Sequence, residues 1–202
     1  MNGVITKRNK QVIGKCILIS TFAVEIILQM NVLELFNHIN TFVFDVDGVL
    51  TDGTLLVLPD GVMARRMNIR DGYAMQLAIK KGYNILIISG GSSDEVKDRL
   101  EKLGIIDVLM KVTDKAAILT QYLKDNKIKK EQVLFMGDDI PDLHALQIAG
   151  LACCPVDAAA EIKSVSQYIS HLKGGEGCAR DVIEKVMKLQ GNWNEDVSVR
   201  AQ

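Results

Sequence analysis

The sequence predicts an α/β protein built on a Rossmann-like, doubly wound parallel sheet. From residue 84 onward, short apolar runs alternate with helix-like segments, and units of this length favour parallel strands covered by helices on both faces. The runs are apolar throughout, as strands buried on both faces require. Polar residues suited to catalysis follow several runs, at the sheet edge where open α/β sheets bind their ligands.

The expected elements begin with a lead-in helix over residues 31–40 and a strand over 42–46. Loose alternation over 54–69, about the turn Pro59-Asp60-Gly61, predicts a β-hairpin. A helix over 73–81 then ends at Gly82. The later elements are strands 84–88, 106–110, 132–136 and 151–154, with helices 93–103, 114–125 and 141–149 between them.

Composition limits the class of protein. The 202 residues suffice for one domain with a sizeable core, and 48% hydrophobic with 24% charged residues is typical of globular proteins. A formal net charge of −1 provides no basic surface, so nucleic acid is not an expected partner. The four cysteines (Cys16, Cys153, Cys154 and Cys178) lack metal-site or disulfide spacing, which predicts reduced thiols and a cytoplasmic protein.

The chain divides into an N-terminal extension of unassigned role (1–35), a catalytic domain (36–190) and a polar tail (191–202). The extension has a basic start and a short apolar run, like a signal peptide, but Glu25 interrupts the run and no A-x-A-like cleavage site follows. The run is also too short for a membrane span, so no membrane association is expected. Alternatively, Met30 is the natural start of the protein.

Two carboxylates follow the first strand. Asp45 and Asp47 point to the same side of an extended chain, and Gly48 and Gly53 allow the backbone to turn away just past them. Carboxylates this close repel unless a cation lies between them, and oxygen ligands of this kind suit Mg²⁺. A lone Asp-x-Asp-Gly is equally compatible with an Asx turn that closes a strand.

The run Asp45-Val46-Asp47-Gly48-Val49-Leu50-Thr51-Asp52-Gly53 resembles the first motif of the haloacid dehalogenase phosphatase superfamily. The later motifs follow in order, over residues 85–90, at Lys115 within 113–116, and over 137–142. The resemblance covers about residues 40 to 190. The Thr-Asp-Gly extension, the short insert after it and the segment 174–180 look most like the capless sugar-acid branch, the 3-deoxy-D-manno-octulosonate (KDO) 8-phosphate phosphatases.

The resemblance implies a role for each motif residue. Asp45 is the expected nucleophile, which forms an aspartyl-phosphate, and Asp47 the acid and base. Mg²⁺ is expected on Asp45, the backbone carbonyl of Asp47, and Asp138. Ser89, Gly90 and Lys115 are expected to bind the phosphate. Asp139 is expected to hold Lys115 or a metal-bound water, and Asp142 to support the site. Each of Ser89, Lys115 and Asp142 has a plainer reading as a cap or helix residue.

The expected substrate is a phosphorylated 3-deoxy-2-keto sugar acid, in the first place KDO 8-phosphate, a lipopolysaccharide precursor. Its carboxylate needs a second polar patch beyond the phosphate site. Gly91 stands where many relatives carry a charged residue, so the nine-carbon analogue, 2-keto-3-deoxynononate 9-phosphate, is an alternative. Candidate substrate-binding residues are Thr51, Arg70, Arg99, Lys102, Gly175 and Arg180.

Two further expectations concern class and assembly. A signalling receiver module also combines acidic residues, a Ser or Thr, a Lys and Mg²⁺, but there the metal-binding acidic pair comes first and the phosphoacceptor stands alone. The insert between Gly53 and Asp71 is too short for a cap domain. The resemblance therefore implies a homotetramer whose hairpins associate, with the apolar run 55–58 buried between chains.

Overall fold

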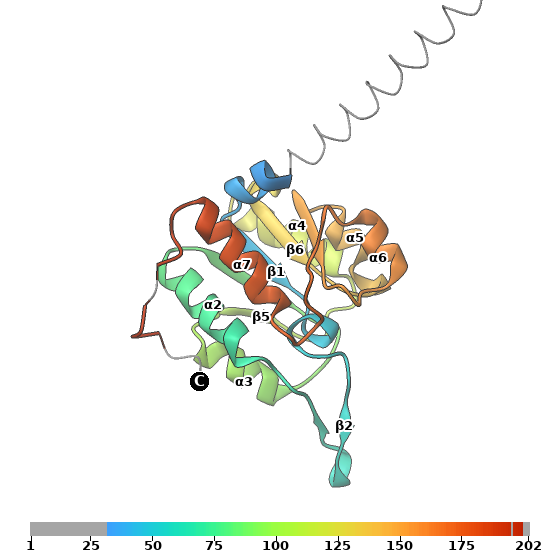
Figure 1. Cartoon of the computed structure of the whole chain (residues 1–202). Helices are drawn as coiled ribbons and strands as arrows, with labels where there is room; N and C mark the ends of the chain where they lie inside the picture. Colours follow the sequence, from blue (N-terminus) through green and yellow to red (C-terminus); the bar gives the residue numbers. More distant parts are fainter. Residues whose placement is uncertain (1–31, 195, 200–202) are drawn as a thin grey trace, which may run out of the picture. The chain divides into compact units, whose positions relative to one another are not determined.

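A computed structural model describes residues 32–194 and 196–199 (Figure 1). The extension over residues 1–29 and the alternative start at Met30 lie outside the described residues. Of the expected lead-in helix, residues 32–38 are helical. Within the described part of the chain, no helix has the length and apolar character needed to cross a membrane.

The core is a six-stranded parallel sheet with strand order β5-β4-β1-β6-β7-β8. The first strand, β1, lies inside the sheet between β4 and β6, so the residues that follow it face both halves. This arrangement confirms the predicted doubly wound sheet. The strands are β1 (Thr41–Phe44), β4 (Asn84–Ile88), β5 (Asp107–Leu109), β6 (Val133–Met136), β7 (Leu151–Cys154) and β8 (Tyr168–Ile169).

Helices cover both faces of the sheet. Along β1, Val43 points to one face and Phe42 and Phe44 to the other, and all three are fully buried. Val43 belongs to a core that includes residues of α4 (Lys115–Asp125), α5 (Leu143–Leu146) and α6 (Ala160–Val165). On the opposite face α2 (Ile69–Lys80) packs beside α7 (Cys178–Leu189), as Figure 1 shows. Helix α3 (Asp94–Lys102) joins β4 to β5.

The predicted hairpin is present, and residues 32–194 form no separate cap domain. Between β1 and α2 the chain forms an antiparallel pair, β2 (Leu56–Val57) and β3 (Met63–Ala64), which projects from the domain in Figure 1. The turn contains Gly61 with a φ of 79°, a conformation that glycine adopts without steric cost. Nothing larger than this hairpin is inserted between β1 and α2.

Several predicted boundaries are wrong for local reasons. Strand β1 ends at Phe44 because Asp45 already caps a π-helical turn, Val46–Leu50. Helix α2 begins four residues earlier than predicted, since the Asn68 side chain accepts a hydrogen bond from the N–H of Arg70 and starts the helix there. The helix expected over 141–149 is a 3₁₀ turn, Ile140–Asp142, followed by the short α5.

No helix or strand is predicted from the sequence over residues 155–190. This segment contains α6, the edge strand β8 and the long amphipathic α7. Cys153, Cys154 and Cys178 are buried free thiols, as predicted for three of the four cysteines. Burial raises the pKa of the Cys178 thiol far above its usual value, which keeps it protonated and unreactive.

Candidate active site

The turn after β1 aims its carboxylates across the sheet edge. Asp45 accepts a 2.7 Å hydrogen bond from the N–H of Val46 on Oδ1, which fixes the side chain at the start of the turn. Gly48 has a φ of 87°, and a Cβ on it would lie 2.0 Å from Asp138 Oδ2. Glycine is therefore required at position 48 both by the backbone and by the approach of Asp138.

Three carboxylates and one ammonium group meet at the centre of this edge. Asp45, Asp138 and Asp142 each offer an oxygen, and these oxygens lie within 4.8 Å of one another. The Nζ of Lys115, at the start of α4, lies 2.9 Å from Asp45 Oδ1 and 2.6 Å from Asp142 Oδ1. Lys115 and Asp142 are buried, so the cluster holds an excess of negative charge away from solvent. We refer to these four residues as the aspartate cluster.

The pKa values reflect this excess. Burial and the nearby Asp142 raise the pKa of Asp45 to about 7, although Lys115 opposes the shift. Burial and the charges of Asp45 and Asp142 likewise raise the pKa of Asp138 to about 7. Burial alone would lower the pKa of Lys115, but the two carboxylates beside it outweigh burial and leave it raised. More positive charge than one lysine supplies would stabilise the ionised cluster.

The donor set fits a hard divalent cation. All the candidate ligands are carboxylate oxygens, the type that Mg²⁺ prefers. Asp138 Oδ1 is buried and has no hydrogen-bond partner among the described residues, so it is an oxygen ready for a ligand. Asp45 and Asp138 thus lie where the sequence predicts metal ligands. Asp142 lies as close to them, although it was expected only to support the site.

The contact with Lys115 belongs to Asp142 rather than to Asp139. Asp142 Oδ1 accepts from Lys115, and Asp142 Oδ2 accepts from the backbone N–H of Asp138 at 3.0 Å. Asp139 is exposed, although it lines the cavity that contains Asp45, Asp138 and Asp142. The 3₁₀ turn after Asp139 brings Asp142 back under the strand end. Gly137 provides the space, because a Cβ there would lie 2.5 Å from Asp142.

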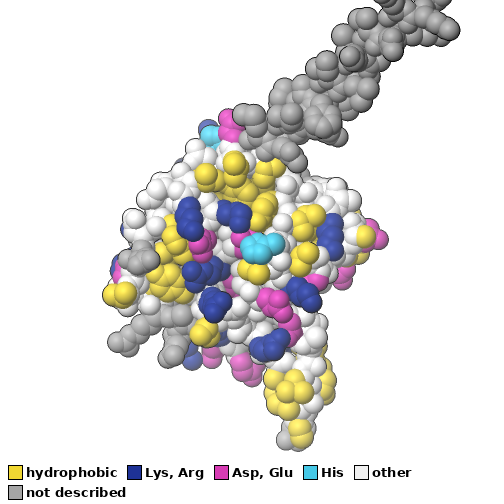
Figure 2. All heavy atoms as spheres, viewed as in Figure 1, with side chains coloured by type: hydrophobic (Ala, Val, Ile, Leu, Met, Phe, Trp, Pro, Cys, Tyr) yellow, Lys and Arg dark blue, Asp and Glu magenta, His cyan; other side chains and the backbone are white. Residues whose placement is uncertain are grey.

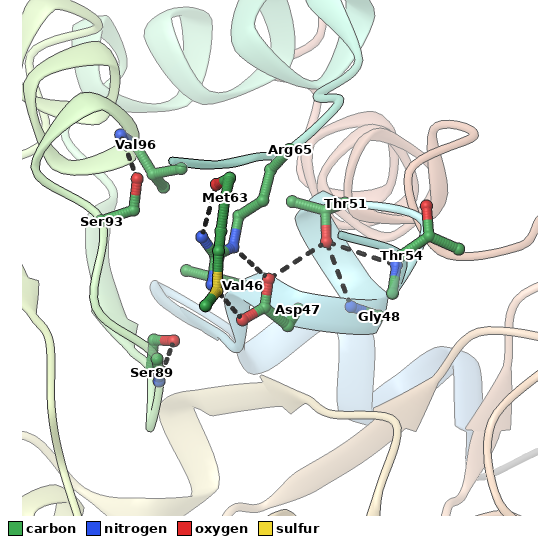
Figure 3. Close-up of polar contacts among 12 residues, drawn as sticks. Val46, Asp47, Gly48, Thr51, Thr54, Met63, Arg65, Ser89, Ser93 and Val96 are labelled. Atoms are coloured by element: carbon green, nitrogen blue, oxygen red, sulfur yellow. Dashed lines mark hydrogen bonds and ion pairs between the residues drawn. The ribbon is translucent and has the colours of Figure 1, made fainter. Parts of the chain in front are cut away.

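Asp47 faces the hairpin instead of the aspartate cluster. Its carboxylate is paired with Arg65, with Nε 2.7 Å from Oδ1 and Nη2 3.2 Å from Oδ2 (Figure 3). The hydroxyl of Thr51 lies 3.5 Å from Asp47 Oδ1 and accepts from the N–H of Gly48 at 3.3 Å, so Thr51 braces the turn. Arg65 was not predicted from the sequence. The only available signal was the pair Arg65-Arg66 within an otherwise apolar hairpin strand.

The aspartate cluster and Asp47 line the same cavity, which has a volume of about 300 Å³. Ser89 follows β4 and is buried, and its Oγ accepts from the N–H of Gly91 at 3.1 Å. The predicted phosphate-binding residues Ser89, Gly90 and Lys115 therefore converge on the carboxylates. The cavity is lined by Asp45, Asp47, Gly53, Ser89, Gly90, Gly91, Val112, Thr113, Lys115, Asp138, Asp139, Pro141 and Asp142.

The other predicted substrate-binding residues lie outside this cavity. Arg99 lines a separate cavity of about 430 Å³ between the hairpin and α3, and Lys102 is exposed on the same helix. Arg70 and Arg180 line a third cavity, of about 510 Å³, beside α7. Gly175 donates its N–H to Val49 O at 2.9 Å, so it joins the segment to the motif turn.

Comparison with known proteins agrees with this geometry. Residues 102–180 match the family model for haloacid dehalogenase-like hydrolases. A KDO 8-phosphate phosphatase of Salmonella typhi is 30% identical over 158 residues, which cover 78% of this chain and 84% of that protein. The chain belongs to the KDO 8-phosphate phosphatase family. This membership excludes the receiver-module alternative.

Solved structures of the KDO 8-phosphate phosphatase family share the fold. The enzyme from Yersinia pestis is 28% identical with a TM-score of 0.78, covering 80% of this chain and 88% of that one. The Moraxella catarrhalis enzyme, in complex with magnesium, phosphate and KDO, is 33% identical with a TM-score of 0.78, covering 81% and 94%. A cobalt-bound Haemophilus influenzae member is 27% identical with a TM-score of 0.74, covering 78% and 92%.

Proposed function

We propose that this protein is a Mg²⁺-dependent phosphatase that hydrolyses KDO 8-phosphate through an aspartyl-phosphate. The observation that carries the proposal is the aspartate cluster at the carboxyl edge of the sheet, in a chain of the KDO 8-phosphate phosphatase family. The Moraxella relative, whose structure contains magnesium, phosphate and KDO, supports both the cofactor and the substrate.

In the first step a carboxylate oxygen of Asp45 attacks phosphorus. The bond between phosphorus and the sugar oxygen breaks, and Asp47 gives its proton to the departing alcohol. Lys115, 2.9 Å from Asp45, orients the attacking carboxylate and offsets the charge of the phosphoryl oxygens. Ser89 and the N–H group of Gly90 bind the same phosphoryl group.

In the second step Asp47, now ionised, takes a proton from a water molecule. The water oxygen attacks phosphorus, the bond to Asp45 breaks, and inorganic phosphate leaves. The electron pair of the broken bond returns to the Asp45 carboxylate, so the enzyme regains its starting state. Asp47→Asn should fail in both steps, and a radiolabelled phosphate assay tests whether it accumulates phosphoenzyme.

Asp45 and Asp138 are the proposed metal ligands, with Asp142 or the backbone carbonyl of Asp47 completing the protein's share. When bound, Mg²⁺ supplies the positive charge that reduces repulsion between the carboxylates and the phosphate. The unpartnered Asp138 Oδ1 and the raised pKa values of Asp45 and Asp138 support this assignment.

The sugar acid needs a cation for its carboxylate, and Arg99 is the first candidate. Its Nη2 is buried and has no hydrogen-bond partner among the described residues. The cavity that Arg99 lines is also lined by Arg65, which pairs with Asp47, so the two cavities adjoin at Arg65. Further candidates are Thr51, Arg70, Lys102, Gly175 and Arg180, of which a neighbouring chain would contribute some.

The substrate is tested by comparing kcat/KM for KDO 8-phosphate, 2-keto-3-deoxynononate 9-phosphate and hexose phosphates. We expect a preference for the sugar acids that falls about 10-fold or more in Arg99→Ala, because a charge-assisted hydrogen bond to the carboxylate is lost. Lys97→Ala is the matched variant on the same helix, because the Lys97 side chain is 44% exposed and pairs with Glu101. A preference for hexose phosphates, or no effect of Arg99→Ala on the acids, contradicts the assignment.

The hairpin supports a homotetramer. Apolar side chains gather at its tip in Figure 2, where Leu56 is 63% and Val57 68% exposed. Such a patch is better accounted for by association than by solvent. Light scattering should give a tetramer for the wild type and a smaller species for Leu56→Asp. Ile106→Asp, at an exposed apolar residue away from the hairpin, is the control, and an active wild-type monomer contradicts the proposal.

A further inference from the structure

Asp47, the proposed acid and base, is held by an arginine that follows the hairpin. Its carboxylate is 38% exposed, whereas the side chain of Arg65 that binds it is 6% exposed. The guanidinium binds both oxygens of Asp47 and also donates from Nη1 to the Met63 carbonyl of β3 at 3.3 Å. Figure 3 shows Arg65, which directly follows β3, reaching to Asp47. A planar fork of this kind fixes a carboxylate in both position and orientation.

Gly91 leaves the space in which this pair lies. A Cβ at position 91 would be 2.8 Å from Asp47 Oδ2, which would require Asp47 to shift, and 3.3 Å from Arg65 Nη2, which is tight by a few tenths of an ångström. The same point is 3.4 Å from Ser89 Oγ, so the pair borders the predicted phosphate-binding corner. Gly91 therefore leaves room for the contact between Arg65 and Asp47, because a side chain at position 91 would shift the Asp47 carboxylate.

We propose that Arg65 is the positioning residue for Asp47, which it holds for proton transfer to the leaving group, and that it thereby couples the hairpin to catalysis. This inference rests on the proposed phosphatase function and adds a residue to it. In its protonated form the Asp47 carboxyl has one O–H donor and keeps acceptor sites for Arg65, so it can donate to the leaving oxygen while the arginine holds it. Without the fork, an exposed Asp47 would sample several rotamers, and few of them would point at the substrate.

A purely structural role for the same ion pair makes a different prediction. If Arg65 only stabilised the hairpin, its loss would reduce hydrolysis of all phosphate esters alike. If Arg65 positions the proton donor, its loss should matter only when the leaving group needs a proton. A sugar alcohol needs one. The p-nitrophenolate ion does not, because it is a stable anion at neutral pH.

The test compares kcat/KM for an alkyl phosphate, KDO 8-phosphate, with that for p-nitrophenyl phosphate. For Arg65→Met we expect a loss on the alkyl ester about 10 to 100 times larger than on the aryl ester, within the usual contribution of general acid catalysis. Arg65→Lys, with one donor group in place of the fork, should recover part of the difference.

Arg66→Met is the matched control. Arg66 is adjacent in sequence, but it is 77% exposed and pairs with Asp52 at 2.8 Å, so both activities should stay within about two-fold of wild type. Equal losses on both esters in Arg65→Met would overturn the inference, and so would an Arg66→Met variant with the same leaving-group dependence.

Failure of the inference can be separated from failure of the proposed function. If the wild type prefers a hexose phosphate, the sugar-acid assignment fails, and the hexose phosphate replaces KDO 8-phosphate as the alkyl ester in the same comparison. If the wild type hydrolyses none of the esters, the phosphatase proposal fails. Crystal structures of wild type and Arg65→Met then decide the positioning role. An Asp47 carboxylate that keeps its place without Arg65 contradicts it.

Discussion

The aspartate cluster and the hairpin side of the site handle negative charge in different ways. In the cluster, three carboxylates share the single ammonium group of Lys115, and burial with mutual repulsion raises two carboxylate pKa values to about 7. On the hairpin side, one carboxylate, Asp47, meets one guanidinium, Arg65. The difference indicates that the aspartate cluster needs an added cation to offset its negative charge. On the hairpin side, Arg65 already offsets the charge of ionised Asp47.

The largest effect should come from the centre of the cluster. Asp45→Asn keeps the shape of the side chain and an acceptor for the Val46 N–H, but it removes the proposed nucleophile. We expect kcat to fall by about 10⁴-fold or more, with a circular-dichroism melting curve close to that of wild type. Substantial phosphate release by the purified variant would refute the covalent mechanism.

Metal dependence tests whether the cluster is short of positive charge. EDTA should abolish activity, and added Mg²⁺ should restore it. Mg²⁺ at 100 times its Kd should also stabilise the folded state by about 2.7 kcal/mol, which raises Tm. Whether Asp138→Asn is more or less stable than wild type should depend on the metal. Without metal the variant should melt higher than wild type, because one of the repelling carboxylates is gone. With Mg²⁺ it should melt lower, and unchanged melting behaviour in both conditions would contradict the metal site.

Asp71 is a buried carboxyl outside the aspartate cluster, so it shows how burial without a metal site changes a carboxyl pKa. Its Oδ1 accepts from the N–H of Arg180 at 2.7 Å, Oδ2 has no partner among the described residues, and burial raises its pKa to about 6. A raised carboxyl pKa means that the folded state binds more protons than the unfolded state between about pH 4 and 6. This carboxyl therefore costs stability as pH rises through that window, by roughly 3 kcal/mol at most.

The stability of Asp71→Asn relative to wild type should therefore increase from pH 4 to pH 7. Asparagine keeps an oxygen for the Arg180 N–H and removes the buried charge. Urea unfolding at the two pH values, without metal, measures the change. A difference between variant and wild type that does not vary with pH would show that Asp71 titrates near its ordinary value.

The smallest effect is expected at the rim of the hairpin side. Arg66→Ala breaks only the exposed pair with Asp52, and pairs of this kind contribute about 0 to 1 kcal/mol. Chemical denaturation should show a change within that range, with little change in activity. A loss of several kcal/mol would contradict the expectation that the exposed Arg66 contributes less to stability than the buried Arg65.

The sequence alone determined the parts of the site that depend on local chain direction. A buried apolar strand that leads directly into Asp45 and then a glycine turn places Asp45 at the sheet edge. The direction of Asp47 did not follow, because strand alternation predicted that it would point to the same side as Asp45, whereas it faces Arg65. The alternation of strands and helices fixed the sheet type and put Ser89 and Asp138 at the same edge. Lys115 at a helix start also followed from the motif order.

Only the tertiary structure decided which charges meet. Asp142 rather than Asp139 reaches Lys115, 27 positions away, because a 3₁₀ turn and the space at Gly137 bring it under the strand end. Arg65 reaches Asp47 across 18 positions because the hairpin folds back over a gap at Gly91. Contacts of this range depend on packing and on space within a few tenths of an ångström, and neither residue periodicity nor composition contains that information.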